Sequence, residues 1–355
     1  MKKLNVAIIG YGRSGCNIHG QFFRSENNDI VNVVAVVELD PARAAVAKQD
    51  FNCDTYSDYR QLLDRKDIDL VVNAAYSHRH YDITRDLLLH KMNVLVEKPF
   101  ARTHYECDEL IKLAQDKGLV LAVFQQTFLA PFYLFAKELA ASGKLGEIKQ
   151  IKLRYNSFSR RWDWQTLQKK CAGNTYNTGP HPIGIALGLM DFDPNIRVAY
   201  SKLENVLSSG DADDSSKIIL DAPGKPFADI EMVANDAYSP YNLKLQGTLG
   251  TFQCTTTEYQ MTYLVPSENP EQPVQEEYIH DGSHNPVYCR EALIKHEEEG
   301  KFNGTAFDTG TASLYEQLYY KLTEGRPMTV TPYMAREVIR VIETVHAQNP
   351  LPVKF

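Results

Sequence analysis

The first 124 residues alternate short apolar, β-branched runs with stretches of helical periodicity. This alternation is typical of a parallel sheet whose strands are joined by crossover helices, so it restricts this part of the chain to an α/β fold. In the last helical stretch, Thr103 is the expected N-cap, Glu106 its capping-box partner and Gly118 the stop. The expected strands cover 6–10, 31–38, 70–75, 93–97 and 119–124, and the expected helices lie near 14–25, 41–49, 58–64, 78–91 and 103–117.

The pattern changes after Pro131. Strand-like segments now follow one another without intervening helices, which indicates an antiparallel or mixed sheet. We therefore expect a doubly wound α/β Rossmann domain at 1–125 and an α+β domain with a large open mixed or antiparallel sheet at 126–330. The last helix, at about 331–347, is expected to pack back on the first domain. Strands are expected within 148–158, 196–206, 216–222, 228–236, 241–255 and 259–265, and helices near 132–142, 286–299, 309–324 and 332–347.

Composition excludes several classes of protein. The length of 355 residues exceeds what one hydrophobic core usually supports, which agrees with two domains. The net charge is -7 with both signs mixed along the chain, so no nucleic-acid partner is expected. No apolar stretch approaches the roughly 20 residues that cross a bilayer, so no membrane partner is expected. Six dispersed cysteines without metal-binding spacing predict free thiols, a reducing cytoplasmic location and no metal site.

The first expected strand runs directly into a GxGxxG motif, Gly10–Gly15, and a helical pattern follows. In this strand-turn-helix context Gly10 permits the tight turn, Gly12 lets the backbone approach a pyrophosphate, and Gly15 lets the helix pack on the strand. The helix N-terminus then favours the diphosphate of a dinucleotide. Glycines that only punctuate a tight turn are the alternative for a lone motif.

The second expected strand ends at Glu38, 23 positions after Gly15. A carboxylate there can accept hydrogen bonds from both ribose hydroxyls of adenosine. Position 39 is leucine and offers no partner to a 2′-phosphate, so we predict NAD instead of NADP. Arg43 is the residue that would weaken this prediction, and we expect it on the exposed side of the following helix.

The tripeptide Glu97–Pro99 follows the fifth expected strand, at the sheet edge where doubly wound folds bind ligands. Combined with the GxGxxG motif and the acid after the second strand, it resembles the hallmark of the glucose-fructose oxidoreductase, inositol dehydrogenase and rhizopine-catabolism family, Gfo/Idh/MocA. His80, the GKLGEI turn at 143–148 and the closing segment 325–345 match as well, so the resemblance covers essentially the whole chain.

The resemblance implies an NAD(P)-dependent oxidoreductase acting on a CH-OH group of a sugar, sugar derivative or inositol. Oxidising a secondary alcohol requires a base for the hydroxyl proton and a cation beside the developing alkoxide. The family places a lysine and a histidine there, which match Lys98 and His181. We expect His181 to be the base, with an ordinary imidazole pKa near 6.5, and Lys98 to orient the substrate electrostatically.

The family motif around this histidine, G-G-G-x-x-D-x-x-x-H-x-x-D, is altered here. Asn177 replaces the first acid, Gly184 replaces the second, and two of the three glycines are missing. Asn177 can orient substrate or imidazole, but it carries no charge to raise the imidazole pKa. Two other functions therefore stay open: redox-neutral, NAD-dependent glycoside cleavage through a keto-sugar, and a catalytically silent cofactor-binding regulator.

Aromatic and polar side chains follow the first strand of the second domain, and such a mixture suits the C-H patches and hydroxyls of a carbohydrate. Packing of Trp162 or Trp164 at the domain interface is the alternative, and Arg160 or Arg161 is suited to an anionic substrate group. The expected substrate contacts are Tyr155, Arg160, Arg161, Trp164 and Tyr176.

Three further expectations concern the site and the assembly. Lys98-Pro99 is expected to be cis, because X-Pro is the common cis linkage. An uncovered sheet face would expose apolar surface, so we expect a homodimer or homotetramer. His80 is expected to line the cofactor cleft. The expected cofactor contacts are Gly10, Gly12, Arg13, Ser14, Gly15, Glu38, Ser77, His80, Glu97, Lys98 and Gln126, and the expected catalytic residues are Lys98, His181 and Asn177.

Overall fold

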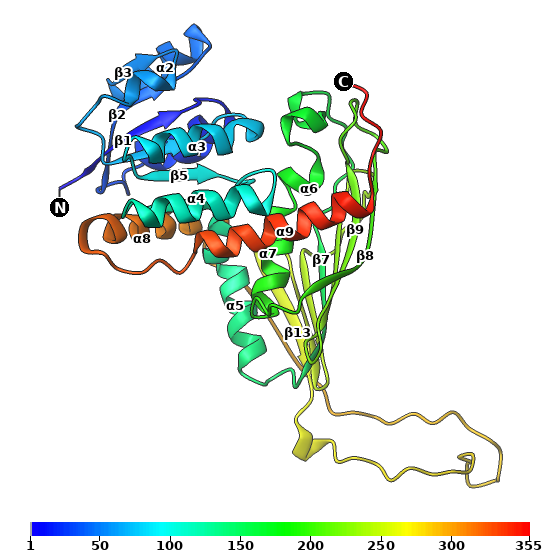
Figure 1. The fold of residues 1–355 in the computed structure, drawn as a ribbon. Coiled ribbons are helices and arrows are strands. Elements are labelled where there is room, and N and C mark those ends of the chain that lie inside the picture. The colour runs from blue at the N-terminus through cyan, green and yellow to red at the C-terminus, as the bar shows by residue number, and fades with distance from the viewer. Residues whose placement is uncertain (1) are drawn as a thin grey trace.

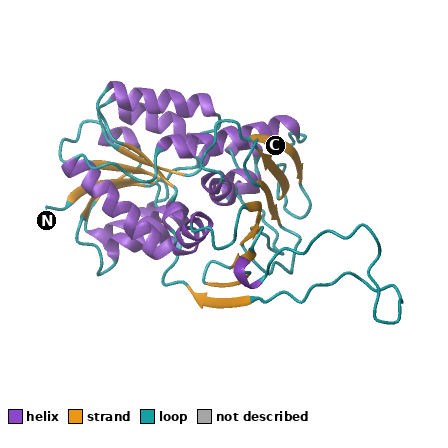
Figure 2. Ribbon diagram, turned by 90° about the horizontal axis from the view of Figure 1, so that it is seen from below, coloured by secondary structure: helices purple, strands orange, loops and turns teal. Residues whose placement is uncertain are grey.

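The computed structural model describes residues 2–355 and contains two β-sheets with helices between them (Figure 1). Helices cover both faces of the first sheet, as Figure 2 shows. The second sheet carries helices on one face only. This arrangement confirms the expected fold class, a doubly wound α/β unit followed by a mixed sheet.

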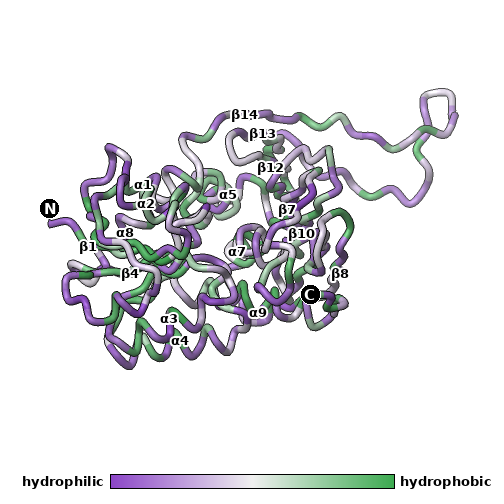
Figure 3. Tube along the Cα trace, turned by 90° about the horizontal axis from the view of Figure 1, so that it is seen from above, coloured by the Kyte–Doolittle hydropathy of each residue, from purple (hydrophilic) through white to green (hydrophobic). Residues whose placement is uncertain are grey.

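The first sheet has six parallel strands in the order β3-β2-β1-β4-β5-β6. Its strands are almost continuously apolar because both faces are covered, and Figure 3 shows hydrophobic residues concentrated along them. The strand order reverses between β1 and β4, the position at which doubly wound folds bind dinucleotides. The strands are β1 (Leu4–Ile9), β2 (Val31–Val37), β3 (Asp54–Tyr56), β4 (Leu70–Asn73), β5 (Val94–Glu97) and β6 (Leu121–Phe124).

The connecting helices largely match the periodicity of the sequence. Thr103 and Glu106 form the predicted capping box at the start of α4. The short edge strand β3 was not expected, and the helix expected at 58–64 is only a 3-10 turn, Tyr59–Leu62. A π-helical turn, Gly15–His19, leads into α1 (Gly20–Arg24), and the others are α2 (Pro41–Phe51), α3 (His80–Leu89) and α4 (His104–Asp116).

The second sheet has eight strands in the order β14-β13-β12-β11-β7-β10-β9-β8, and only β7 and β10 pair in parallel. Its helix-covered face packs against α7 and α9. The strands are β7 (Ile148–Arg154), β8 (Arg197–Glu204), β9 (Ser215–Asp221), β10 (Phe227–Val233), β11 (Leu243–Gly247), β12 (Gly250–Cys254), β13 (Glu258–Tyr263) and β14 (His296–Lys301). The helices are α5 (Pro131–Ala141), α6 (Asn174–Asn177), α7 (Pro180–Leu189), α8 (Thr311–Glu324) and α9 (Pro332–Gln348).

The helix expected near 286–299 is wrong. Residues 264–295 form a long extended arm that closes into the edge strand β14 (Figure 1). The segment EALIKHEEE consists of good helix formers, but its end pairs with β13 in antiparallel register from Tyr263↔His296 to Glu258↔Lys301. Tertiary pairing therefore overrides local propensity here.

The uncovered face of the second sheet is polar, which corrects the expectation of an exposed apolar surface. Strand side chains alternate between faces, and the fully buried apolar ones, such as Ile218 and Ile230, point toward the helices, while charged side chains and a few apolar ones lie on the open face. On the open face, Arg154 Nη2 lies 3.1 Å from Asp229 Oδ2 and Lys217 Nζ lies 3.1 Å from Glu231 Oε2. Any partner on this face would therefore meet charge and not bare apolar surface.

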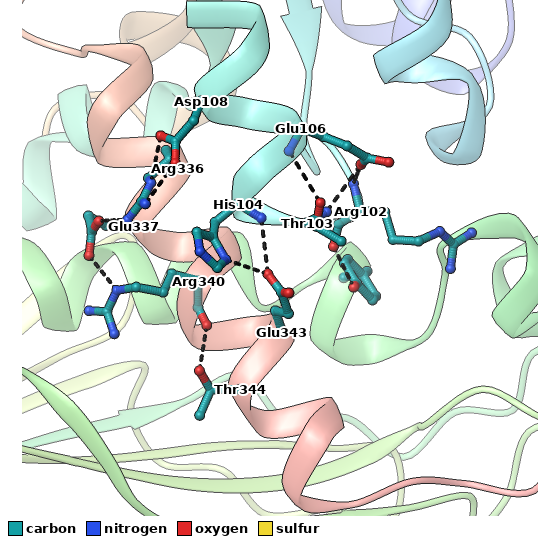
Figure 4. Close-up of polar contacts among 11 residues, drawn as sticks. Arg102, Thr103, His104, Glu106, Asp108, Arg336, Glu337, Arg340, Glu343 and Thr344 are labelled. Carbon is teal, nitrogen blue, oxygen red and sulfur yellow. Dashed lines mark hydrogen bonds and ion pairs between the residues drawn. The ribbon is translucent and has the colours of Figure 1, made fainter.

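Helix α9 lies between the two sheets and packs against both α4 and β8. Polar contacts join α9 to α4, as Figure 4 shows: Glu343 Oε2 accepts hydrogen bonds from His104 N (3.0 Å) and Nδ1 (2.6 Å), and Arg336 forms a two-point ion pair with Asp108. The two sheets are thus held together by one long helix of the C-terminal segment.

Candidate active site

The GxGxxG turn is closed too tightly for side chains at two of its glycines. Gly10 has a φ of +87°, and a Cβ there would lie 2.5 Å from the carbonyl oxygen of Ala74. A Cβ at Gly15 would lie 1.9 Å from the carbonyl oxygen of Gly10. The side of Gly12 is open, with nothing within 4 Å of its Cβ position. This open, bare backbone at a helical start fits a pyrophosphate, and Arg13 and Ser14 belong to the same turn.

Glu38 follows β2 and faces the glycine turn. Its Oε2 accepts a hydrogen bond from Tyr11 N (2.8 Å), and its Oε1 accepts from Asp40 N (3.0 Å) and from Arg43 Nη2 (2.8 Å). Burial alone would raise the pKa of Glu38, but these hydrogen bonds lower it overall, so the group is a carboxylate. Arg43 is exposed, as expected, and its guanidinium is nevertheless paired with Glu38.

Glu97, at the end of β5, is buried, and protein groups occupy both of its carboxylate oxygens. Its Oε2 accepts from Lys98 N (3.0 Å), and its Oε1 lies 3.1 Å from His19 Nε2. Tyr315 Oη of α8 lies 2.6 Å from the other ring nitrogen of His19. Burial opposes ionisation, but the hydrogen bond and charge of His19 lower the pKa of Glu97 to about 2. The carboxylate therefore fixes the backbone that carries Lys98.

Lys98 reaches across to the second domain. The Lys98-Pro99 peptide bond is cis, as predicted. Lys98 Nζ donates a hydrogen bond to the backbone oxygen of Asn177 at 2.9 Å. Burial lowers the pKa of Lys98, and the nearby positive charges of Arg13 and Arg161 lower it further. The side chain of Lys98 is thus held at the boundary between the two domains by the backbone oxygen of Asn177.

His181 lies in the first turn of α7, and its Nδ1 is 2.6 Å from Thr127 Oγ1. Burial, followed by the charge of Lys98, lowers its pKa to about 3, well below the expected 6.5. The imidazole is therefore neutral at neutral pH and able to accept a proton. If Nδ1 donates to the hydroxyl of Thr127, Nε2 is left as the acceptor. Thr127 was missed because no motif marks a single threonine after β6.

The two positions where the family acids would stand are occupied differently. Asn177 Oδ1 accepts a hydrogen bond from Gln165 Nε2 at 3.1 Å, which leaves its amide nitrogen as the group that could orient a substrate or the imidazole. At Gly184, a Cβ would lie 2.6 Å from Gln125 Nε2. That amide nitrogen donates to the carbonyl oxygen of Pro180 at 2.6 Å, so Gln125 fills the space an acid would need.

Among the other expected cofactor contacts, His80 is buried. It is 1% exposed, and its ring nitrogens face the carbonyl oxygens of Pro99 (2.7 Å) and Ala75 (3.1 Å). The ring of His80 therefore connects the loop after β4 to the loop after β5. Ser77 begins the turn that precedes α3. Gln126, after β6, has a buried Oε1 without a hydrogen-bond partner within residues 2–355, which leaves an acceptor available to a bound amide.

The two tryptophans have different environments. Trp164 packs edge-on against Tyr76 of the first domain, with ring centroids 5.0 Å apart. Lys170 Nζ lies 5.2 Å from the same tyrosine ring. Trp162 is 81% exposed. Trp164 therefore packs at the interface between the two domains, which was the alternative to substrate binding for one of the two tryptophans.

The remaining expected substrate contacts differ in their burial and in their partners. Tyr176 is buried, donates to the carbonyl oxygen of Arg102 at 2.9 Å and stacks on His346, so it is not available to a substrate. Arg161 lies close enough to Lys98 to affect its pKa, but its guanidinium is paired with Asp163 at 2.6 Å and 3.0 Å. Arg160 is exposed, and burial raises the pKa of Tyr155 at the end of β7.

Within residues 2–355, no group of three or more His, Cys, Asp and Glu side chains is placed to hold a metal ion. In the same residues, no helix combines the length and apolarity needed to cross a membrane. The six cysteines are unpaired.

Two sequence profiles match the chain. The profile described as the oxidoreductase family with an NAD-binding Rossmann fold matches residues 4–125, and that of the Gfo/Idh/MocA C-terminal domain matches residues 133–253. The chain is 28% identical over 223 residues to the uncharacterized oxidoreductase C26H5.09c of Schizosaccharomyces pombe, covering 62% of this chain and 60% of that protein. It is 23% identical over 258 residues to a 2,7-anhydro-N-acetylneuraminate hydratase of Mediterraneibacter gnavus, covering 71% and 67%.

A solved structure supports the fold over the whole length. The NAD-binding protein from Listeria innocua superposes with a TM-score of 0.81 at 18% identity, covering 98% of both chains. The chain spans only about three fifths of the length of the first of these curated relatives and about two thirds of the second.

Proposed function

Because the chain belongs to the Gfo/Idh/MocA family of oxidoreductases, whose first domain is an NAD-binding Rossmann fold, we propose that it is an NAD-dependent dehydrogenase. Its substrate would be a sugar, a sugar derivative or an inositol with a free secondary hydroxyl. The observation that carries this proposal is that Lys98 of the first domain donates a hydrogen bond to the backbone oxygen of Asn177 in the second, at 2.9 Å, four residues before His181, whose pKa the charge of Lys98 lowers.

Bound NAD+ supplies the hydride acceptor. Lys98 directs a positive charge at the substrate oxygen, where negative charge develops as the proton leaves. His181, neutral because of its low pKa, accepts that proton, and Thr127 holds its ring in place. The low pKa makes the imidazole a weak base, and the nearby negative charge of Glu97 favours the imidazolium that forms when it accepts the proton. Asn177 contributes the backbone oxygen that positions Lys98.

NAD is preferred over NADP in this proposal. A carboxylate at Glu38 accepts hydrogen bonds from the ribose hydroxyls and repels a 2′-phosphate. Arg43 is committed to Glu38 and so is not a free phosphate ligand. The open glycine backbone fits the central pyrophosphate, and the unpartnered amide oxygen of Gln126 fits the carboxamide at the nicotinamide end.

The test is an assay of the purified protein with NAD+ and a panel of sugars, sugar acids, glycosides and inositols, with absorbance of NADH as the readout and NADP+ as the parallel control. NADH formation with one class of compound is the expected result and identifies the substrate. Intact NADH binding with no turnover across the panel would favour the catalytically silent regulator.

Two observations favour a second function. The match to a 2,7-anhydro-N-acetylneuraminate hydratase, together with the loss of both family acids at Asn177 and Gly184, favours a redox-neutral reaction in which a keto-sugar forms transiently and the reduced cofactor is used again. Product analysis by mass spectrometry on the same samples separates the two, because this route changes the sugar without accumulating NADH.

We also infer the cellular setting and the domain limits. Six unpaired cysteines favour a reducing, cytoplasmic location. We propose two domains, at 1–125 and 126–330, each of which is stable by itself. Helix α9 packs against α4 of the first domain. A homodimer or homotetramer is proposed as the working form.

A further inference from the structure

Lys170 ends a short turn of the second domain, Gln168–Lys170, and its ammonium contacts two residues of the first domain. Lys170 Nζ lies 5.2 Å from the centroid of the Tyr76 ring and 3.5 Å from His78 Nε2. Only one of the three ammonium donors faces the His78 nitrogen. Lys170 makes no ion pair with any residue that the structure describes, and its side chain is partly exposed. It is therefore a positioned cation whose charge no carboxylate compensates.

The contact with Lys170 determines which ring nitrogen of His78 carries the hydrogen. A lysine ammonium can only donate, so Nε2 is the acceptor, and Nδ1 of the neutral ring is the donor. His78 Nδ1 is buried and has no hydrogen-bond partner within residues 2–355. A buried N–H group without an acceptor is costly in free energy. The group missing beside this donor is therefore a hydrogen-bond acceptor.

The charged side chains that act on the His78 ring are positive. Burial, followed by the charges of Lys170, Arg79 and Arg102, lowers the pKa of this imidazole to about 4, so the ring is neutral at neutral pH. Arg102 donates its guanidinium hydrogens to backbone oxygens, and Arg79 has one carboxylate, that of Asp82, at 4.0 Å. We call Lys170, His78, Arg79 and Arg102 the cation cluster. In a chain with a net charge of -7 it is a local excess of positive charge, which attracts an anion.

A chain of contacts connects the cation cluster with the candidate active site. Trp164, which packs on Tyr76, begins a short turn in which Gln165 is the next residue. Gln165 Nε2 donates to Asn177 Oδ1 at 3.1 Å, and the backbone oxygen of Asn177 accepts from Lys98 Nζ at 2.9 Å. Gln165 Oε1 is buried without a hydrogen-bond partner among residues 2–355. In this chain of contacts, an unused acceptor for a hydroxyl group stands between the site of Lys98 and the cation cluster.

We propose that the cation cluster binds the carboxylate or phosphate of an acidic sugar derivative, with Lys170 and His78 as the two donors. This inference rests on the proposed function and narrows its substrate to the acidic members of that class. The substrate hydroxyl meets Lys98, while the oxyanion accepts charge-assisted hydrogen bonds from Lys170 Nζ and a hydrogen bond from His78 Nδ1. The anion reaches His78 through a shift of the loop after β4, in which Tyr76 and Arg79 are exposed.

The first experiment measures anion binding without turnover. Inorganic phosphate is titrated into protein saturated with NAD+, and the fluorescence of Trp164 is the readout in a Trp162→Phe background, because the chain has two tryptophans. Saturable binding is expected. Lys170→Gln should weaken the affinity for phosphate by about tenfold or more, since a hydrogen bond to a charged group is lost. Lys169→Gln, which changes the neighbouring exposed lysine, is the matched control.

A second variant tests the other donor. His78→Gln keeps an acceptor for the ammonium of Lys170 but removes the Nδ1 donor, so it should weaken phosphate binding about 3- to 10-fold. Absence of saturable binding, or an unchanged affinity in either variant, would overturn the proposed pair of donors. Phosphate binding that disappears when NAD+ is added would assign the cation cluster to the diphosphate of the cofactor and would also overturn the proposal.

The last experiment separates this inference from the proposed function. In the panel assay, a sugar acid or sugar phosphate should have a KM at least about tenfold lower than its uncharged counterpart, and Lys170→Gln should remove most of that difference with little change in kcat. Turnover of uncharged compounds only, at the same KM in Lys170→Gln, would overturn the anion site and leave the dehydrogenase in place. Phosphate binding that depends on Lys170, with no turnover of any compound, would support the anion site and contradict the proposed dehydrogenase.

Discussion

Lys98 and His181 occupy the site through different kinds of support. The lysine follows a strand end whose backbone is held by buried Glu97, whereas the histidine starts a helix of the other domain and is held by Thr127. Both have lowered pKa values, because burial and neighbouring positive charge penalise their charged forms. Their chemistry therefore depends on how the two domains meet.

Removing either side chain should abolish most of the turnover. We expect Lys98→Met and His181→Asn each to lower kcat by about 10²-fold or more, because a positioned acid-base group contributes 10²–10⁴-fold. NADH affinity, measured by fluorescence titration, should change little. Lys112→Met and His90→Asn, both on the outer surface of the first domain, serve as controls. A Lys98→Met protein as active as the wild type would remove the lysine from the mechanism.

Cofactor choice should depend on the carboxylate after β2. We expect Glu38→Ser to raise the KM for NAD+ by roughly tenfold, because hydrogen bonds to the ribose hydroxyls are lost, and to lower the KM for NADP+, because Arg43 is then free to meet a 2′-phosphate. Steady-state kinetics with both cofactors provide the measurement. The variant Glu26→Ser, a carboxylate in a surface loop, is the control. Unchanged preference in Glu38→Ser would contradict the assignment.

The low pKa of His181 has a consequence for stability. In the unfolded chain the imidazole titrates near 6.5, and in the folded chain near 3, so between these values only the unfolded state gains the proton. The free energy of unfolding should therefore fall as pH falls from about 6.5, by about 1.4 kcal/mol per pH unit from this group. Urea titrations from pH 6.5 to pH 4 should give a shallower pH dependence for His181→Asn than for the wild type. Parallel curves would argue against a lowered pKa.

Secondary-structure elements position the site through the loops at their ends. The loop before α3 carries Tyr76, and the loop after β7 carries Trp164, which packs on it from the other domain. This contact links a cofactor-side loop to the segment expected to meet the substrate. We therefore expect a change at Trp164 to alter substrate binding.

We expect Trp164→Ala to raise the KM for the substrate about 2- to 10-fold with little change in kcat, because an aromatic pair contributes about 0.5–1.5 kcal/mol beyond its buried area. Trp162→Ala, which removes a neighbouring but exposed ring, should behave as the wild type. Comparison of the two variants with the substrate found in the panel assay decides the point. Equal kinetics for both variants would place Trp164 outside the substrate site.

At the scale of the whole molecule, α9 joins the two sheets by packing on α4 and β8. The apolar side of the helix supplies buried Val338, Ile342 and Val345, and the polar contacts in Figure 4 fix its register on α4. The relative position of Lys98 and His181 is thus set partly by a helix that carries neither residue.

Weakening the contact between α9 and α4 should destabilise the protein without changing the candidate active site. We expect Glu343→Gln to lower the free energy of unfolding by about 1–3 kcal/mol, since Glu343 accepts two hydrogen bonds from His104 and its charge is lost. Urea denaturation gives the measurement, and Glu316→Gln on the exposed side of α8 is the control. Unchanged stability would mean that the apolar side of α9 alone joins the sheets.

The sequence by itself determined the doubly wound domain, the glycine turn, Glu38, the cis Lys98-Pro99 bond and the capping box of α4. These features depend on local spacing, on strand periodicity or on a backbone conformation that one residue type favours. Their physical causes lie within a few neighbouring positions, so a single chain displays them.

Only the tertiary structure decided the rest. Glu97 and His80 are buried beside the candidate site, and Arg43 pairs with Glu38. The hydroxyl of Tyr176 donates to the backbone oxygen of Arg102, and the hydroxyl of Thr127 contacts the ring of His181. Likewise, residues 296–301 became a strand because β13 offered an open edge. Each outcome depends on groups distant in sequence that share one buried space or one sheet edge, and burial and hydrogen bonding between such groups outweigh local propensity.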